Sequence, residues 1–150
     1  MSNVVFVQNS GINESLALTE LSAALRRAGH STRLFLADEE KSLSSELRTI
    51  QAQVAIIPCH VAGHEEALSY AALIKEVAPS CLVVLAGTHA TFDPELALES
   101  TVDAVCVGEA DQALVELCNA VAAGKDWRTG PNLAFNDHGL QQTEKLALIA

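Results

Sequence analysis

Basic and aromatic residues are both scarce in this chain of 150 residues. Nine Lys and Arg stand against nineteen Asp and Glu, which gives a net charge of −10 at neutral pH, and Phe, Trp and Tyr together make up 4%. Nucleic acids and anionic membranes are bound by clustered basic surfaces, and unpaired bases are bound by aromatic stacking. The composition therefore argues against both nucleic acid and a membrane surface as the partner.

Long apolar runs are also lacking, although 49% of the residues are hydrophobic. No run approaches the roughly 20 residues that span a bilayer, and the longest, near residues 81–86, has the length of a strand. The N-terminus has neither the basic region nor the cleavage pattern of a signal peptide. We expect a cytoplasmic protein with one ordinary domain and a single core.

Closely spaced cysteines are absent. The chain has four cysteines, at positions Cys59, Cys81, Cys106 and Cys118. No CxxC or CxxxCxxC motif results, and cysteines within strands or helices are usually reduced and buried. Cys59 differs because it ends an expected strand beside His60, with His64 one helical turn further on. A zinc site there would lack an evident fourth ligand, so zinc is a minor hypothesis.

Strand and helix signals alternate along most of the chain. Extended runs, mostly apolar, are expected at residues 3–8, 31–36, 53–58, 81–86 and 102–107. Helices are expected at residues 14–27, 42–51, 63–77 and 111–123, with a short one from Pro94. Near-continuous apolar strands indicate a parallel sheet that is covered on both faces. We predict a doubly wound, Rossmann-like α/β domain over residues 1–124, with a five-stranded parallel sheet in the flavodoxin-like order 2-1-3-4-5.

Residues 125–150 differ from the alternating part. Two short extended pieces, 131–135 and 140–143, flank the turn sequence Asn136-Asp-His-Gly139 and predict a C-terminal β-hairpin. The last residues show no helix cap or stop signal. We expect this part to be a hairpin and linker that leads toward a further domain or partner.

The candidate binding residues come after the strands, because ligands of doubly wound sheets bind beyond the carboxyl ends of the strands. They are Asn9, Ser10, Gly11 and Ile12 after the first strand; Pro58, Cys59, His60 and Gly63 at the third; Ala86, Gly87, Thr88, His89, Ala90 and Thr91 at the fourth; and Gly108 and Glu109 at the fifth. Several are small, which lets a large group approach the backbone. The threonines offer hydroxyl groups, and Glu109 either accepts from a ligand or caps a helix.

Three common functions of such a fold are disfavoured by the same positions. A phosphoacceptor receiver domain needs acidic residues after the first and third strands and a lysine after the fifth, where this chain has Gln8-Asn9, Pro58-Cys59 and Val107-Gly108. Without those carboxylates it has neither a Mg²⁺ site nor a nucleophile. The GxGxxG sequence of dinucleotide-binding domains and the phosphate loop and stacking aromatics of flavodoxins are missing as well.

Four segments in order carry a resemblance to a known family. They are "LTELSAALRRAGHSTRLF", "APSCLVVLAGTHATFDPE", "VDAVCVGEAD" and "GPNLAFNDHGL". Together they resemble the cobalamin-binding domains that precede the catalytic core of radical S-adenosylmethionine enzymes. The resemblance implies that the candidate residues bind cobalamin at the carboxyl edge of the sheet, with the hairpin joining this domain to the catalytic one. The family often has Gly and Pro where this chain has Ala86 and Thr88.

The resemblance also implies how cobalamin is held. Methionine synthase-type domains carry DxHxxG after the first strand, and its histidine ligates cobalt, whereas this chain reads Gln8-Asn-Ser-Gly-Ile-Asn-Glu14. We therefore expect base-off cobalamin without that histidine. The iron–sulfur cluster and S-adenosylmethionine would belong to a separate domain, in cis or in trans, with methyl transfer as the expected reaction. The alternatives are a cofactor-free protein-interaction module and a small hydrolase or metal-dependent enzyme built on Cys59 and His60.

Overall fold

A single sheet of seven strands forms the centre of the computed structural model, which describes residues 1–8, 16–37, 43–60 and 63–146. The strand order is β2-β1-β3-β4-β5-β6-β7. The parallel strands are β1 (Asn3–Gln8), β2 (Ser31–Leu36), β3 (Val54–Pro58), β4 (Leu82–Ala86) and β5 (Ala104–Cys106). The predicted parallel order 2-1-3-4-5 is therefore confirmed.

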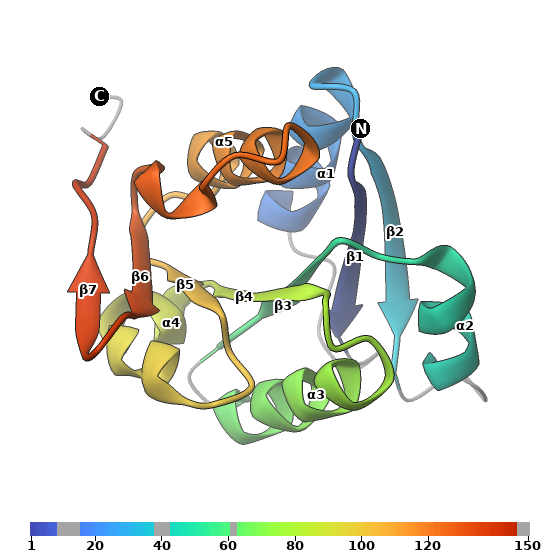
Figure 1. Cartoon of the computed structure of the whole chain (residues 1–150), viewed down its shortest axis with the longest axis horizontal. Helices are drawn as coiled ribbons and strands as arrows, with labels where there is room; N and C mark the ends of the chain where they lie inside the picture. Colours follow the sequence, from blue (N-terminus) through green and yellow to red (C-terminus); the bar gives the residue numbers. More distant parts are fainter. Residues whose placement is uncertain (9–15, 38–42, 61–62, 147–150) are drawn as a thin grey trace.

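The hairpin extends this same sheet. Strand β6 (Leu133–Asn136) pairs antiparallel with β5, and β7 (Leu140–Gln142) pairs antiparallel with β6 (Figure 1). Leu133, Ala134 and Phe135 are buried, and Trp127 packs edge-on against Phe135 at 5.7 Å between ring centroids. The hydrophobic side chains of β6 thus continue the core past β5, and the predicted C-terminal hairpin is confirmed.

Helices cover both faces of the sheet. One face carries α1 (Leu16–Arg27) and α5 (Asp111–Ala122), and the other carries α2 (Leu43–Ile50) and α3 (His64–Val77) (Figure 1). Alternate residues of each strand point to opposite faces. In β1, Val4 and Phe6 pack on the side of α1 and α5, whereas Val5 and Val7 pack on the other side. Two continuous hydrophobic clusters result, which explains why the strands read as uninterrupted apolar runs.

The connection from β4 to β5 holds one helix that was not predicted. Helix α4 (Thr88–Phe92) begins directly after Gly87 and is followed by the 3-10 helix η1 (Pro94–Leu98). A second 3-10 helix, η2 (Trp127–Thr129), lies between α5 and β6. The sequence predicted only the short helix from Pro94 in the connection between β4 and β5. The extra turn forms because Thr91 N–H donates to the carbonyl of Gly87 at 3.0 Å and His89 N–H donates to that of Cys59 at 3.1 Å.

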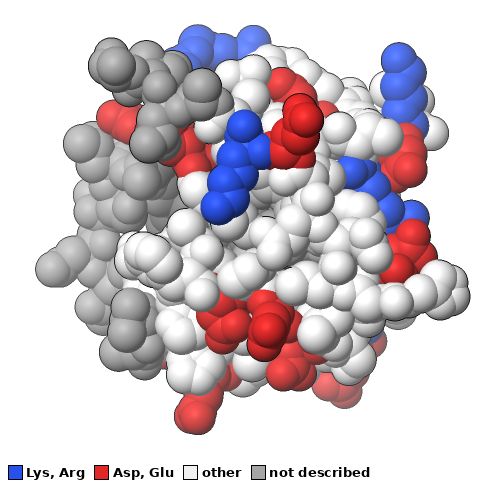
Figure 2. All heavy atoms as spheres, turned by 90° about the vertical axis from the view of Figure 1, so that its left-hand side faces the viewer, with Lys and Arg blue, Asp and Glu red and all other residues white. Residues whose placement is uncertain are grey.

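On the surface that faces the viewer from the side of β7, several Asp and Glu side chains gather in the lower part of the view (Figure 2). Lys and Arg side chains lie apart from one another there, between broad areas of uncharged residues. No helix within the described residues is long and apolar enough to cross a membrane.

Candidate functional site

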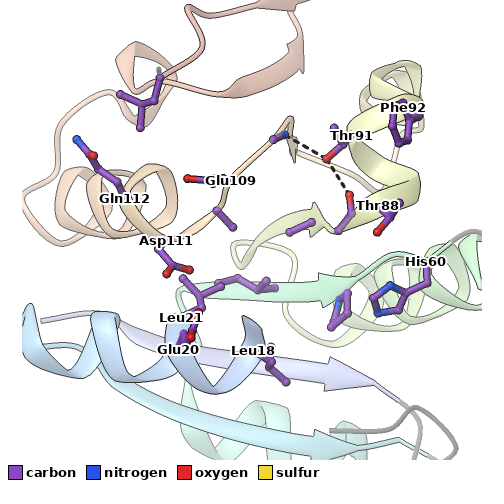
Figure 3. Close-up of a pocket in the computed structure, with 17 residues that line it drawn as sticks. Leu18, Glu20, Leu21, His60, Thr88, Thr91, Phe92, Glu109, Asp111 and Gln112 are labelled. Carbon is purple, nitrogen blue, oxygen red and sulfur yellow. Dashed lines mark hydrogen bonds between the residues drawn. The ribbon is translucent and has the colours of Figure 1, made fainter. Parts of the chain in front are cut away.

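A cavity of about 750 Å³ lies at the carboxyl ends of β3, β4 and β5, on the side of the sheet that α1 and α5 cover (Figure 3). Pro58, Ala86 and Gly108 supply its sheet edge, Leu18 and Leu21 come from α1, and the start of α5 and one face of α4 close it. The remaining lining residues are Glu20, Ile56, His60, Gly87, Thr88, Thr91, Phe92, Glu109, Ala110, Asp111, Gln112 and Leu146. Its position is the one at which doubly wound sheets bind ligands.

Half of the predicted binding residues line this cavity. They are Pro58, His60, Ala86, Gly87, Thr88, Thr91, Gly108 and Glu109. Four others, Cys59, Gly63, His89 and Ala90, lie at the predicted strand ends without lining it. The loop residues Asn9, Ser10, Gly11 and Ile12 fall outside the described part of the chain.

Gly87 brings the ends of β3 and β4 into direct contact. Its φ is +125°, and a Cβ at this position would lie 2.8 Å from the carbonyl oxygen of Cys59. Real side chains do not tolerate such a distance to a backbone atom, so only glycine fits. The Cys59 N–H donates to the carbonyl of Ala86 at 2.7 Å, which holds the two strand ends in place. The small residue at the end of β4 therefore serves the packing of the chain against itself.

Cys59 is sealed behind this contact. Its exposed fraction is 0%, and burial, together with the nearby Asp93 carboxylate, raises the pKa of its thiol from 9.0 to about 11. A nucleophilic cysteine needs a lowered pKa and access to substrate. The geometry thus gives no support to a hydrolase built on Cys59 and His60.

Thr91 joins the ends of β4 and β5 across the cavity (Figure 3). Its hydroxyl donates to the carbonyl of Gly87 at 2.9 Å and accepts from the N–H of Gly108 at 3.1 Å. Gly108 has a φ of +101°, and the nearest atom to a Cβ built there would be Asn132 Nδ2, at 3.9 Å. The end of β5 therefore has open space beside the backbone, unlike the end of β4.

The histidines near the site differ in their surroundings. His60 lines the cavity, whereas His64 and His89 stack on each other with ring centroids 4.6 Å apart. His64 Nδ1 and His89 Nε2 are buried and have no hydrogen-bond partner among the described residues. Asp93 Oδ2 lies 3.6 Å from His89 Nε2, which is too far for a hydrogen bond. Among the residues that the structure describes, no three His, Cys, Asp or Glu side chains are grouped as metal ligands would be.

Asn132 connects the cavity wall to the C-terminal segment. Its Nδ2 donates to the carbonyl of Glu109 at 3.0 Å, and its Oδ1 accepts from the N–H of Leu146 at 2.7 Å. The residue is buried and has a φ of +58°, a conformation that asparagine tolerates better than most residues. This connection places Leu146 in the cavity lining, although Asn132 itself does not line it.

Several lining residues were not predicted from the sequence. Leu18 and Leu21 were expected only as apolar core residues of the helix at residues 14–27, and nothing in the local sequence singled out Leu146. Phe92 comes directly after the predicted segment and is 83% exposed at the cavity, which is unusual for so large an apolar side chain. Extending the predicted segment by one residue would have included it.

These features define an open, doubly wound α/β domain with a cavity at the carboxyl edge of its sheet. A family model described as the B12 binding domain matches residues 3–118. The chain therefore belongs to the B12-binding domain family, and the resemblance to cobalamin-binding domains seen in the sequence is confirmed.

Individual relatives agree with this assignment. The chain is 30% identical over 81 residues to the uncharacterized methyltransferase PH0819 of Pyrococcus horikoshii, covering 53% of this chain and 18% of that protein. The structure of TsrM from Kitasatospora setae, a radical S-adenosylmethionine methyltransferase with cobalamin and a [4Fe-4S] cluster bound, matches 100% of this chain and 30% of that chain, with 18% identity and a TM-score of 0.80.

The fold is also shared with a protein of another class. A response regulator from Thermotoga maritima matches 82% of this chain and 99% of its own length, with a TM-score of 0.60 and 18% identity. At such identities the structural likeness concerns the fold alone. The chain spans less than a third of the length of PH0819 and of TsrM.

Proposed function

We propose that this chain binds cobalamin base-off at the carboxyl edge of its sheet, as the cofactor-binding module of a larger radical S-adenosylmethionine methyltransferase. The observation that carries the proposal is the cavity of about 750 Å³ at the ends of β3, β4 and β5 in a chain of the B12-binding family. It lies where this fold binds ligands, and half of the residues that the sequence singled out for this role line it.

The lining residues fit the chemistry of cobalamin. Ile56, Leu18 and Leu21 give the cavity an apolar side that suits the benzimidazole base of the nucleotide tail. Thr88 and Gln112 carry a hydroxyl and an amide that can hydrogen-bond to the amide groups around the corrin. Gly108 leaves backbone surface open and Ala86 presents only a methyl group, which suits the close approach of a broad ring. We therefore assign these residues to cofactor binding.

The base-off state is supported by the sequence after β1. Gln8 ends the strand, and the segment Asn9–Glu14 contains no histidine that could ligate cobalt from that position. His60 is the histidine that lines the cavity, and His89 is turned toward His64 and Asp93. We propose that no protein histidine ligates cobalt and that the residues of this chain bind and orient the cofactor only.

Catalysis would require a further domain. Cobalamin supplies a carrier for methyl groups when it is bound, and TsrM combines it with an iron–sulfur cluster. All four cysteines of this chain are buried and free, and the sequence has no CxxxCxxC motif to hold such a cluster. We propose that the cluster and S-adenosylmethionine are held by a radical S-adenosylmethionine domain, in cis or in trans.

Cobalamin binding in the cavity can be tested by placing a bulky side chain at the end of α5 that lines it. Ala110 is the N-terminal cap of α5 and lines the cavity, whereas Ala123 caps the other end of the same helix. Purified protein would be mixed with hydroxocobalamin, passed through gel filtration and examined for a retained corrin spectrum. We expect retention by the wild type and by Ala123→Trp, and loss with Ala110→Trp. Absence of retention by the wild type at high protein concentration would favour the cofactor-free interaction module.

The coordination of cobalt has its own measurement. In the reduced cob(II)alamin state, a nitrogen ligand produces superhyperfine splitting in the electron paramagnetic resonance spectrum. We expect no such splitting for the bound cofactor, and no change on His60→Ala or His89→Ala. Splitting that disappears in one of the two variants would identify that histidine as a ligand and contradict the proposed base-off site without a protein histidine.

A further inference from the structure

Gln8 has an unexplained feature at the end of β1. Its exposed fraction is 3%, and its side-chain oxygen Oε1 is buried and has no hydrogen-bond partner among the residues that the structure describes. Native structures rarely leave a buried amide oxygen in this state, because the oxygen has lost its hydrogen bond to water and gained nothing in return. Such an atom calls for an explanation, and one explanation is a ligand that supplies the missing donor.

Gln8 lies where two neighbouring strands part. Strand β1 pairs with β2 as far as Gln8 and Leu36, but its pairing with β3 stops at Phe6 and Ile56. Strand β3 nevertheless continues to Pro58, which lines the cavity. Since β1 has β2 on one side and β3 on the other, this is the topological switch point of the sheet. The carbonyl of Gln8 accepts from the N–H of Ala37 at 2.7 Å, so its backbone is held by the β2 side.

The side chain of Gln8 belongs to the face that holds the cavity. Residues two apart in a strand share a face, and Val4 and Phe6 pack into the cluster beneath α1 and α5. Leu21 and Ile56 belong to that same cluster and line the cavity. By this alternation the side chain of Gln8 lies on the face of the sheet that holds the cavity, although Gln8 itself is not among the lining residues.

We propose that Gln8 is a cobalamin-binding residue, whose Oε1 accepts a hydrogen bond from an N–H or O–H group of the cofactor. Cobalamin offers such donors in its primary amides and in the ribose of its tail. The role rests on the proposed function of the chain and adds a specific polar contact at the switch point. It also accounts for the unpaired oxygen, which the bound state would satisfy.

Replacing Gln8 with methionine tests this role, because methionine has a similar length and shape but no hydrogen-bonding amide. We expect Gln8→Met to weaken hydroxocobalamin binding about tenfold, the effect of losing one well-placed hydrogen bond. We also expect the melting temperature of the cofactor-free protein to stay the same or to rise, because the unpaired buried oxygen is gone. A purely structural role would lower binding and stability together.

The control and the second variant separate the possible outcomes. Gln142→Met replaces an exposed strand glutamine on β7 and should change neither binding nor melting temperature. Gln8→Leu should repeat the result of Gln8→Met with a different apolar shape. If both Gln8 variants bind hydroxocobalamin like the wild type, or if both lower the melting temperature, the assignment of Gln8 is overturned. If the wild type itself retains no cobalamin, the proposed function fails rather than this residue's part in it.

Discussion

The ends of β4 and β5 both carry a glycine at the cavity, and the two glycines serve different purposes. A Cβ on Gly87 would lie 2.8 Å from the carbonyl oxygen of Cys59, with two more backbone atoms of Cys59 within 3.4 Å. A Cβ on Gly108 would meet nothing closer than Asn132 Nδ2 at 3.9 Å. The end of β4 is closed by the chain itself, whereas the end of β5 is open.

This difference shows that a glycine at a strand end can serve the folding of the chain at one position and leave room for another group at the next. A small residue at a strand end is compatible with a ligand beside it, but it is equally compatible with another backbone segment. At Gly87 the backbone of Cys59, directly after β3, takes that place, and at Gly108 the space beside the backbone stays open. Stability measurements on the two strand ends should therefore diverge.

Gly87→Ala is expected to have the largest effect. Both the φ of +125° and the contact with Cys59 oppose a side chain, so the free energy of unfolding should fall by about 4 kcal/mol. Urea unfolding would measure this loss. Gly139→Ala is a matched control, because Gly139 has a φ of +126° and no atom within 4 Å of its Cβ position. It should cost about 2 kcal/mol, and equal losses at both positions would contradict the closed end of β4.

Asn132→Ala is expected to have the second largest effect on stability, because Asn132 joins the segment after β5 to the C-terminal segment. The substitution removes the bonds to the Glu109 carbonyl and the Leu146 N–H, and it places alanine at a φ of +58°. We expect the free energy of unfolding to fall by about 3 kcal/mol. Asn136 is a suitable control, since its Oδ1 accepts from Gly139 N–H in an exposed turn. Asn136→Ala should cost less than about 1 kcal/mol, and a similar cost at both asparagines would argue against this role.

Gly108→Ala tests the open end of β5 directly. Its φ of +101° strains alanine, but no atom stands closer than 3.9 Å, so we expect a loss of about 2 kcal/mol in the free energy of unfolding. That is the cost expected for the Gly139→Ala control. Hydroxocobalamin binding would then distinguish the two, because only Gly108 of this pair lines the cavity. Unchanged binding by Gly108→Ala would mean that the open space is not used.

Much of this architecture follows from patterns that a sequence carries locally. Apolar runs mark the buried parallel strands, and the Asn136–Gly139 turn marks the hairpin, because strand burial and turn conformation depend on nearby residues. Helix α4 could not be predicted in the same way. Threonine and histidine are weak helix formers, and its five residues are held by contacts with Cys59 and Gly87 that lie elsewhere in the fold.

Only those residues of the site that follow the ends of strands could be predicted from the sequence. The sequence grouped Cys59 with Pro58 because the two residues are adjacent. Neighbouring side chains of a strand point to opposite faces of the sheet, so Pro58 lines the cavity and Cys59 is buried in the cluster on the other face. Leu146 reaches the cavity through a hydrogen bond to Asn132, fourteen residues earlier, and no local pattern encodes such a contact.

The smallest expected effect concerns Cys59 and pH, and it tests whether the end of β4 is truly closed. Burial first, and the Asp93 carboxylate second, raise the pKa of the thiol from 9.0 in the unfolded chain to about 11 in the folded protein. The folded state therefore holds this proton more tightly. Its contribution to stability is complete below pH 9 and is lost as the pH rises through 11.

Cys59→Ala removes the part of the pH dependence of stability that comes from the Cys59 thiol and leaves the parts that come from the other three cysteines. Between pH 7 and pH 9.5, the wild type should lose roughly 0.8 kcal/mol more in free energy of unfolding than Cys59→Ala does. Urea unfolding at both pH values for both proteins gives the difference directly, and the common effects of pH cancel. Parallel pH dependences would show that water reaches the thiol in the folded protein. The contact between Gly87 and Cys59 would then not seal the end of β4, and the contrast with the open end of β5 would fail.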